Sequence, residues 1–485
     1  MCTIWTRRNA RVNLGRARRS TNIISARTGT KKRAAAAGPS RPFPLMRDAT
    51  ASRSFARARA ARSLRMTPPR RSEREKKRRF AERSQRFAWR TQWNGYREAE
   101  SQRVTEQPAP QTVGANQIDL VLVAGARPNF VKLAPLHHAL APYAALRKTI
   151  VHTGQHYDEA MSEVFFRELG IPSPDINLEV GPGTHAEQTA GVMVGFERVV
   201  QRLRPRCVVL FGDVNSTVAC ALVAAKVGVP VAHVEAGLRS NDWSMPEEVN
   251  RVVTDRLSSR LYAPSRDACE NLAREGISPD RVRLVGNIMV DTLLAQLPSV
   301  DRVQTLREFG LEPQRFILVT LHRPSNVDDA TMLTKICEIL RLVSEGEPVL
   351  FPAHPRSLRR LRELQLEGSL GATRVVPPLP YRSFLALMAS ARAVVTDSGG
   401  VQEETTALGV PCLTLRANTE RPVTITEGTN QLVEAEPESF RRALDACNGR
   451  RHRVPELWDG QTGQRIAADL QAFLGDLGKQ GGRKK

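Results

Sequence analysis

The sequence predicts an α/β fold made of two doubly wound, Rossmann-like domains. From residue 118 onward, short apolar segments alternate with segments of helical periodicity. The apolar segments lack the polar alternation of strands that face water on one side, which is typical of parallel sheets covered by helices on both faces. The pattern lapses between Gly286 and Leu311 and then restarts. The 369 residues from 117 to 485 are also too many for one hydrophobic core, so two domains are expected.

The expected elements follow in chain order. The first domain has strands at 118–124, 149–153, 207–211, 231–235, 260–263 and 282–285, with helices at 130–140, 159–169, 186–203, 217–227, 247–258 and 266–275. The second has strands at 316–320, 349–353, 374–376, 393–396 and 412–415, with helices at 331–344, 384–389, 401–408 and 438–447. We place the first domain at 117–287 and the second at 288–462. A helix at 463–478, apolar on one face, is expected to pack back on the first domain, before a basic tail at 479–485.

Residues 1–116 differ from the rest in charge. They contain 29 Lys and Arg against 7 Asp and Glu and carry the whole formal net charge of +22, because residues 117–485 hold 43 of each. The segment has no apolar periodicity that could build a core, so we expect a basic, disordered extension. It could bind nucleic acid or an anionic surface, or be an organelle transit segment. It could also be translated upstream sequence, with a native start at an internal methionine such as Met46 or Met66. We favour the third reading, since no nucleic-acid module is recognisable.

The cysteines and the apolar segments suggest the compartment. The seven cysteines lie far apart, and none belongs to a Cys-x-x-Cys pair. This spacing is typical of reduced, buried thiols and predicts neither a disulfide framework nor a metal site. No apolar segment reaches the roughly 18 residues that a membrane span needs. We therefore expect a soluble cytoplasmic protein with no membrane span.

Polar residues follow the expected strands, at the sheet edge where open α/β sheets bind ligands. Three acids follow strands of the first domain or begin the helix after one, namely Asp213, Glu235 and Glu247. Cations and imidazoles occur at strand ends in both domains, namely Arg127, Lys132, His322, His354 and Arg421.

A strand, a Ser-Gly-Gly turn and a helix start occur together at residues 393–408. The turn is Ser398-Gly399-Gly400. Backbone N–H groups at a helix N-terminus favour an anion, and glycines allow a diphosphate to approach closely. Glu403 and Glu404, one turn into the helix, are poorly placed for a phosphate but well placed to accept hydrogen bonds from ribose hydroxyls.

Each of these residues also has a simpler interpretation. Asp213 could cap the next helix, and His354, before a proline, could be only a turn residue. Glu235 and Glu247 could be paired with Arg239 and Arg251. His233, at the end of an apolar strand, fits a hydrogen-bonded core histidine better than a catalyst. The convergence of so many polar residues on strand ends argues against the simpler interpretation for all of them.

Eight motifs at these positions occur in a fixed order. They are Gly-Ala-Arg-Pro-Asn-Phe-Val-Lys, Gly-Gln-His, Phe-Gly-Asp, His-Val-Glu-Ala-Gly-Leu-Arg, Met-Pro-Glu-Glu-Val-Asn-Arg, Leu-His-Arg-Pro, Asp-Ser-Gly-Gly-Val-Gln-Glu-Glu and Thr-Glu-Arg-Pro. Together they resemble the non-hydrolysing UDP-N-acetylglucosamine 2-epimerases, over residues 118–472. The resemblance implies a glycosyltransferase-B-type fold with the active site between two domains, a homodimer, and no cofactor or metal. It also implies interconversion of UDP-GlcNAc and UDP-ManNAc at C2, in the supply of cell-surface polysaccharide.

The resemblance also assigns roles to residues. Elimination of UDP across C1–C2 and its re-addition require acid–base groups near C2 and a clamp on the diphosphate. The implied catalytic set is Asp213, Glu235, Glu247, Lys132 and His322. The implied UDP-binding set is Arg127, His354, Ser398, Gly399, Gly400, Glu404 and Arg421, with His322 also near the diphosphate. The sequence does not show which carboxylate is the base.

Two residues depart from the family pattern. Asn129 stands where the first motif often has Glu, which could shift sugar selectivity. Gly191 falls where some bacterial members have an arginine of a second UDP-GlcNAc site, so activation at such a site is in doubt.

Other functions remain as alternatives. A UDP-2,3-diacetamido uronic acid epimerase would use the same motifs. A UDP-sugar glycosyltransferase of the same fold would need one base, which the three acids argue against. A hydrolysing epimerase would release free ManNAc, and an inactive relative would bind UDP without turnover. Nucleic acid is not an expected partner, because residues 117–485 are neutral.

Overall fold

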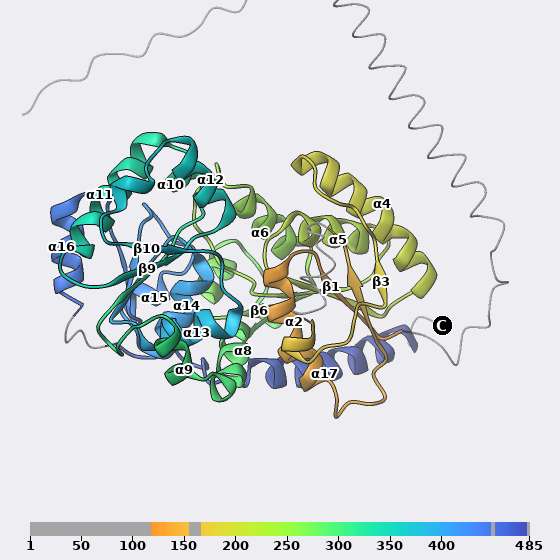
Figure 1. Ribbon diagram of the computed structural model, residues 1–485. Helices are drawn as coiled ribbons and strands as arrows, with labels where there is room; N and C mark the ends of the chain where they lie inside the picture. Colours follow the sequence, from red (N-terminus) through yellow and green to blue (C-terminus); the bar gives the residue numbers. More distant parts are fainter. Residues whose placement is uncertain (1–117, 155–165, 448–451, 483–485) are drawn as a thin grey trace, which may run out of the picture. The chain divides into compact units, whose positions relative to one another are not determined.

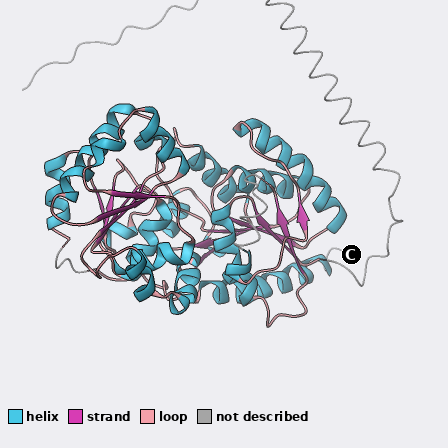
Figure 2. Cartoon of the chain, in the orientation of Figure 1, coloured by secondary structure: helices cyan, strands magenta, loops and turns pink. Residues whose placement is uncertain are grey.

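Two parallel sheets with helices on both faces form the framework of the chain (Figures 1 and 2). The computed structural model describes residues 118–154, 166–447 and 452–482. In these residues the strand order is β3-β2-β1-β4-β5-β6-β7 in the first sheet and β10-β9-β8-β11-β12-β13 in the second. The direction of winding reverses between β1 and β4 and between β8 and β11, which is where sheets of this kind bind ligands. The predicted fold class is confirmed.

The first sheet is built from residues 120–284. Its strands are β1 (Leu120–Ala124), β2 (Lys148–His152), β3 (Ile176–Asn177), β4 (Cys207–Phe211), β5 (Val231–Val234), β6 (Arg260–Ala263) and β7 (Val282–Leu284). The helices are α2 (Arg127–Ala139), α4 (His185–Leu203), α5 (Asn215–Lys226), α6 (Pro246–Leu257) and α7 (Arg266–Arg274), with a short turn η1 (Pro279–Arg281). Side chains of β1 alternate between two cores. Leu120 and Leu122 pack in the core that includes α2, and Val121 and Val123 pack in the core that includes α4 and α5.

The second sheet repeats this arrangement. Its strands are β8 (Ile317–Thr320), β9 (Val349–Pro352), β10 (Arg374–Val376), β11 (Ala393–Thr396), β12 (Cys412–Thr414) and β13 (Asn430–Leu432). The helices around it are α10 (Pro324–Val327), α11 (Ala330–Ser344), α12 (Pro355–Glu363), η3 (Glu367–Leu370), α13 (Tyr381–Ser390), α14 (Gly399–Leu408), α15 (Val423–Thr426) and α16 (Pro437–Asp445). Ile317 and Val319 pack in one core with α11, and Leu318 packs in the other with α13.

Helices at two places connect the sheets. Between β7 and β8 lie α8 (Ile288–Gln296), η2 (Leu297–Ser299) and α9 (Arg302–Glu308), in the segment where the sequence showed only a lapse of strand periodicity. The last helix, α17 (Thr462–Gly482), packs against α2 and buries Ile466 and Leu470 in the core of the first sheet. Its Asp469 accepts a hydrogen bond from the Tyr262 hydroxyl on β6 (2.9 Å).

The predicted elements agree with the structure to within a few residues at their ends. Sequence reasoning missed the short edge strands β3 and β13 and the helices α8, α9, α10, α12 and α15. The helix expected at 159–169 lies mostly outside the described residues, because the description resumes at residue 166.

A proline inside α2 is compensated by a side chain from α8. Pro135 has no N–H, so the carbonyl of Val131 lacks its usual partner within the helix. The Thr292 hydroxyl donates to this carbonyl instead (2.6 Å). α2 also carries Lys132, so this contact supports a helix that contributes to the predicted site.

We expect Thr292→Val to destabilise the protein by about 1–3 kcal/mol, the cost of leaving a buried carbonyl without a donor. In a Pro135→Ala background the loss should shrink, because the alanine introduced there would supply the missing N–H. Urea unfolding of the four proteins gives the coupling between the two positions. Thr334→Val is the control, because the exposed Thr334 hydroxyl donates to the Ala330 carbonyl within α11 (2.8 Å). An equal loss in both backgrounds would contradict the explanation.

Candidate active site

Glu235 lies at the centre of the predicted site and has an unusual backbone conformation. It directly follows β5 with φ of 74°, in the left-handed region that residues other than glycine seldom adopt. Its side chain is buried and bound by two cations. Lys132 Nζ contacts Oε2, and Arg421 Nη2 donates to Oε1 (2.8 Å). Such strain persists where the surroundings fix the conformation, and it is concentrated at functional sites.

Gly212, after β4, provides the space for this ion pair. Its φ is +65°, and a Cβ at this position would lie 2.9 Å from Lys132 Nζ and 3.3 Å from Glu235 Oε2. A larger residue would be strained at this φ and would force the lysine Nζ to shift. The glycine before Asp213 is therefore required by the packing of two predicted site residues.

Arg421 joins the second sheet to Glu235. Its Nε lies 2.8 Å from Glu403 Oε1, and Nη1 contacts Glu420. Burial lowers the pKa of Arg421, but Glu403 and the other carboxylates outweigh it, and the net pKa lies above the usual value. The guanidinium lies against the Ser-Gly-Gly turn, since a Cβ on Gly399 would collide with Nη1.

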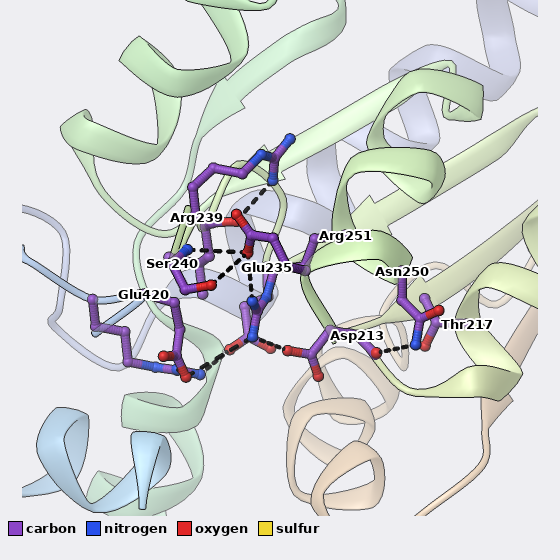
Figure 3. Close-up of polar contacts among 12 residues, drawn as sticks. Asp213, Thr217, Glu235, Arg239, Ser240, Asn250, Arg251 and Glu420 are labelled. Atoms are coloured by element: carbon purple, nitrogen blue, oxygen red, sulfur yellow. Dashed lines mark hydrogen bonds and ion pairs between the residues drawn. The ribbon is translucent and has the colours of Figure 1, made fainter. Parts of the chain in front are cut away.

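Asp213 is held by Arg251 from α6. Arg251 Nη2 donates to Asp213 Oδ2 (2.5 Å), and Asn250 Nδ2 donates to the Asp213 carbonyl (2.8 Å; Figure 3). Burial alone would raise the pKa of Asp213. Arg251 and Lys132 lower this pKa by more than burial raises it, so the net pKa lies below the usual value. The side chain keeps 26% of its surface exposed, so an ionised carboxylate remains accessible.

A buried aspartate fixes the loops that carry these acids. Asp255, on α6, accepts hydrogen bonds from His233 Nδ1 (2.7 Å) and the Gly237 amide (3.0 Å), and it pairs with Arg239 (2.8 Å). The other nitrogen of His233, Nε2, lies 2.8 Å from the Gly212 carbonyl oxygen. His233 is thus a hydrogen-bonded core histidine, as predicted. Through it, α6 holds the turn before Asp213 and the turn after Glu235.

Three of the simpler interpretations are wrong. The N-cap position of α5 is Val214, and Asp213 binds Arg251. Arg239 pairs with Asp255 and Glu275 rather than with Glu235. Arg251 pairs with Asp213 and Glu248 rather than with Glu247. Glu247 lies in the first turn of α6 and is half-buried. Its negative charge opposes the lowering of the pKa of Arg323, a residue of the second sheet, by burial.

The second sheet places its two predicted histidines close together. Their ring centroids lie 5.9 Å apart. Buried Asp397 accepts from the amides of His322 (3.1 Å) and Arg323 (2.9 Å), and His322 Nδ1 lies 3.1 Å from its Oδ1. His354 Nδ1 accepts the Arg356 amide (3.2 Å) at the start of α12, so His354 is also the turn residue that the simpler interpretation expected. Burial and His322 lower the pKa of His354, which favours the neutral ring.

The Ser-Gly-Gly turn begins α14. Ser398 is the N-cap residue, its side chain forms no capping hydrogen bond, and Ser398, Gly399 and Gly400 are half-buried. The first amides of this helix are suited to an anion. Arg127 begins α2, but its side chain lies outside the described part of the structure.

Two neighbouring glutamates follow this turn. Glu403 binds Arg421, and Glu404 Oε1 accepts a hydrogen bond from the Tyr381 hydroxyl (2.9 Å). Burial raises the pKa of each to about 7. Arg421 opposes this rise at Glu403, and Tyr381 opposes it at Glu404.

Asn129 is a structural residue. Its Oδ1 accepts the amides of Gly125 (3.2 Å) and Ala126 (2.9 Å), and its Nδ2 donates to the Phe211 carbonyl (2.8 Å). The side chain is 2% exposed. A carboxylate could not make the third bond, because it has no donor. The amide joins the turn after β1 to the end of β4, and these contacts do not support the suggested role in sugar selectivity.

Sequence reasoning missed four residues that organise the site. They are Asp255, Asp397, Glu420 and Tyr381. Asp255 lies four residues after Arg251, on the same face of α6, which was a usable signal. Asp397 and Glu420 stand inside two of the eight motifs, but no local pattern reveals their partners or that of Tyr381.

Other features of the described residues lie apart from this site. A cavity of about 620 Å³ is lined by α2, α8 and neighbouring loops, including Tyr143, Asp291 and Gln296, and by none of the predicted site residues. In the described ranges, no group of three or more His, Cys, Asp and Glu side chains could hold a metal ion. No helix there is long and apolar enough to cross a membrane.

Comparison with known proteins places this chain in a family. Residues 138–471 match the family model for UDP-N-acetylglucosamine 2-epimerase. A UDP-N-acetylglucosamine 2-epimerase of Methanocaldococcus jannaschii is 42% identical over 360 residues, which cover 72% of this chain and 98% of the relative. A UDP-2,3-diacetamido-2,3-dideoxy-D-glucuronate 2-epimerase of Pseudomonas aeruginosa is 41% identical over 322 residues, covering 65% and 88%. The crystal structure of the M. jannaschii UDP-GlcNAc 2-epimerase with UDP-GlcNAc and UDP has a TM-score of 0.68 and 40% identity, and the match covers 73% of this chain and 100% of that one.

The raised pKa of Glu404 predicts a pH-dependent stability. The folded state keeps this proton up to about pH 7, whereas the unfolded chain loses it near its ordinary value of 4.5, so the contribution of Glu404 to stability falls as pH rises between these values. Glu404→Gln cannot titrate. The stability of wild type relative to this variant should therefore fall by up to about 3 kcal/mol across that range.

Urea unfolding at several pH values measures this difference. Glu187→Gln is the control of opposite sign, because hydrogen bonds from Thr184 lower the pKa of Glu187. A pH-independent difference between wild type and Glu404→Gln would contradict a raised pKa.

Proposed function

The chain belongs to the UDP-N-acetylglucosamine 2-epimerase family, and we propose that it interconverts UDP-GlcNAc and UDP-ManNAc by eliminating and re-adding UDP. The observation that carries the proposal is the meeting of Glu235, Lys132 and Arg421. Glu235, a carboxylate of the first sheet, binds Arg421 there, and Arg421 lies against the Ser-Gly-Gly turn of the second sheet.

The reaction requires both the carboxylates of the first sheet and the proposed diphosphate-binding groups of the second. A carboxylate removes the C2 proton, the C2–H electrons form the C1–C2 double bond, and UDP leaves with the electrons of the C1–O bond. UDP then adds back to C1 while an acid delivers a proton to the opposite face of C2. The two steps together neither add nor remove atoms or electrons. UDP must be retained between them, which requires a diphosphate site beside the acids.

Asp213 is our first candidate for the base. Arg251 and Lys132 keep its pKa low against the effect of burial, and its carboxylate is partly exposed. Glu235 also binds cations, but its side chain is only 7% exposed. Glu235 and Glu247 remain candidates for the group that returns the proton. Lys132 holds Glu235 in position for either role.

The second sheet offers the groups that would bind UDP. The amides at the start of α14 suit the diphosphate. His322 and His354 follow β8 and β9 of the same sheet and would also bind UDP. Arg421 lies against Gly399, where it could stabilise the charge that UDP gains on leaving. Glu404 is placed to hold the ribose, and Arg127 would complete the clamp.

The sugar is a separate question. The M. jannaschii structure contains UDP-GlcNAc, and the P. aeruginosa relative is named for a diacetamido glucuronate. We place UDP-GlcNAc first, because the match to the M. jannaschii relative named for it covers 98% of that relative, whereas the match to the P. aeruginosa relative covers 88%. A uronate is the second candidate. Action as a homodimer in the cytoplasm, in the supply of cell-surface polysaccharide, follows from the family resemblance alone.

The test is incubation of the purified protein with UDP-GlcNAc in D₂O, followed by NMR. We expect UDP-ManNAc as the product and deuterium at C2 of both nucleotide sugars. Turnover without deuterium at C2 would exclude the elimination mechanism. Free ManNAc would indicate a hydrolysing enzyme, and turnover only with the UDP-diacetamido uronate would establish the second substrate.

We expect Asp213→Asn to slow epimerisation by about 10²–10⁴-fold, the usual effect of losing a positioned acid or base. UDP affinity should change little, because Asp213 is not one of the proposed UDP-binding groups, and all of these except Arg127 belong to the second sheet. Loss of C2 deuterium exchange along with turnover would identify Asp213 as the base. Asp301→Asn, at the exposed N-cap of α9, is the control for the substitution itself. Exchange at the wild-type rate in Asp213→Asn would assign the base to Glu235 or Glu247.

A further inference from the structure

Tyr381 connects two helices at the proposed nucleotide site. It is the first residue of α13, and its hydroxyl donates to Glu404 Oε1 on α14 (2.9 Å). The ring packs with the second-sheet core that includes Leu385 and Val401. The hydroxyl is therefore held in place by its backbone and by its ring, and it contacts a carboxylate that is only 5% exposed.

The position of Glu404 on α14 relates it to the phosphate-binding turn. Residues four apart on a helix lie on one face. Glu404 therefore shares a face with Gly400, and Glu403 shares one with Gly399. Glu403 binds Arg421, which lies against Gly399, in agreement with this geometry. The two adjacent glutamates thus have different partners, and Glu404 is the one on the face of the second glycine.

The hydrogen bond determines what the Glu404 carboxylate can do. An ionised carboxylate has about four acceptor positions, and two adjacent hydroxyls of a ribose can occupy two of them. Only the ionised form accepts from both hydroxyls without competing as a donor. Burial disfavours that form, whereas the Tyr381 hydroxyl stabilises it. The same bond fixes the plane of the carboxylate, which reduces the entropy lost when a ligand binds.

We propose that Tyr381 is a positioning residue that holds the Glu404 carboxylate for the 2′ and 3′ hydroxyls of the ribose. This inference rests on the proposed function, in which Glu404 binds the ribose of UDP. Tyr381 itself does not contact the reacting atoms. Its role is to make the ribose a recognised part of the substrate, so that a nucleotide without these hydroxyls is bound less tightly.

The experiment combines a change in the protein with a change in the ligand. Binding of UDP and of 2′,3′-dideoxy-UDP is measured by calorimetry for wild type and Tyr381→Phe. Phenylalanine keeps the ring and removes the donor. We expect Tyr381→Phe to weaken UDP binding by about 5–12-fold, the value of one hydrogen bond, and to change dideoxy-UDP binding by less than about twofold. With saturating substrate, kcat should stay near wild type while KM rises.

Tyr262→Phe is the matched control. The Tyr262 hydroxyl also donates to a carboxylate at 2.9 Å, that of the partly buried Asp469, but at the first sheet and α17. The same chemical deletion there should lower stability and leave the affinity for both nucleotides unchanged. A structural effect of Tyr→Phe is thereby separated from an effect on the ribose.

Glu404→Gln distinguishes failure of the inference from failure of the proposed function. It should weaken binding of UDP and have little effect on dideoxy-UDP. If wild type binds no UDP, the proposed function is wrong and the inference falls with it. If wild type prefers UDP but Tyr381→Phe weakens both nucleotides equally, the proposed function stands and the positioning role is overturned.

Discussion

The ion pair between Glu235 and Arg421 joins the first sheet to the second at the candidate active site. Both side chains are buried, so neither charge is compensated by water. A buried charge that loses its partner costs several kcal/mol. The remaining contacts of each group reduce this cost, because Lys132 also binds Glu235 while Glu403 and Glu420 bind Arg421. The orientation of one strand-end loop toward the other is therefore fixed by electrostatics as well as by apolar packing.

The first sheet maintains its part of this arrangement through α6. Asp255 holds the Gly237 amide and, through His233, the Gly212 carbonyl. The left-handed backbone of Glu235 lies between these two anchored turns. The helix that positions the turns also supplies Arg251 to Asp213 and begins with Glu247. One helix thus positions all three acids, and this explains how acids that follow separate strands are held in fixed positions relative to one another.

The sequence predicted the sheets well because their strands are buried on both faces and read as continuous apolar segments. β3 and β13 escaped detection because they have only two and three residues and include Asn177, Asn430 and Gln431. α8 escaped because nearly all of its first two turns is buried, so it has no polar face to give a helical period. The rule that ligands bind at the carboxyl ends of parallel strands identified residues that lie together at the site, but it could not identify their partners. Glu235 is 103 residues from Lys132 and 186 from Arg421, and no local pattern encodes such distances.

The position of Arg421 connects binding to the proposed chemistry. Its guanidinium has five donors in a fixed plane, and three carboxylates share them in the structure. The same group lies against Gly399, at the turn suited to a diphosphate. A departing diphosphate gains negative charge, so in the proposed reaction it would compete with the three carboxylates for Arg421. Its attraction to Arg421 would weaken the hold of Arg421 on Glu235 as the C1–O bond breaks. One arginine, shared between the acids and the diphosphate, would in this way link the charge on UDP to the contacts that hold Glu235.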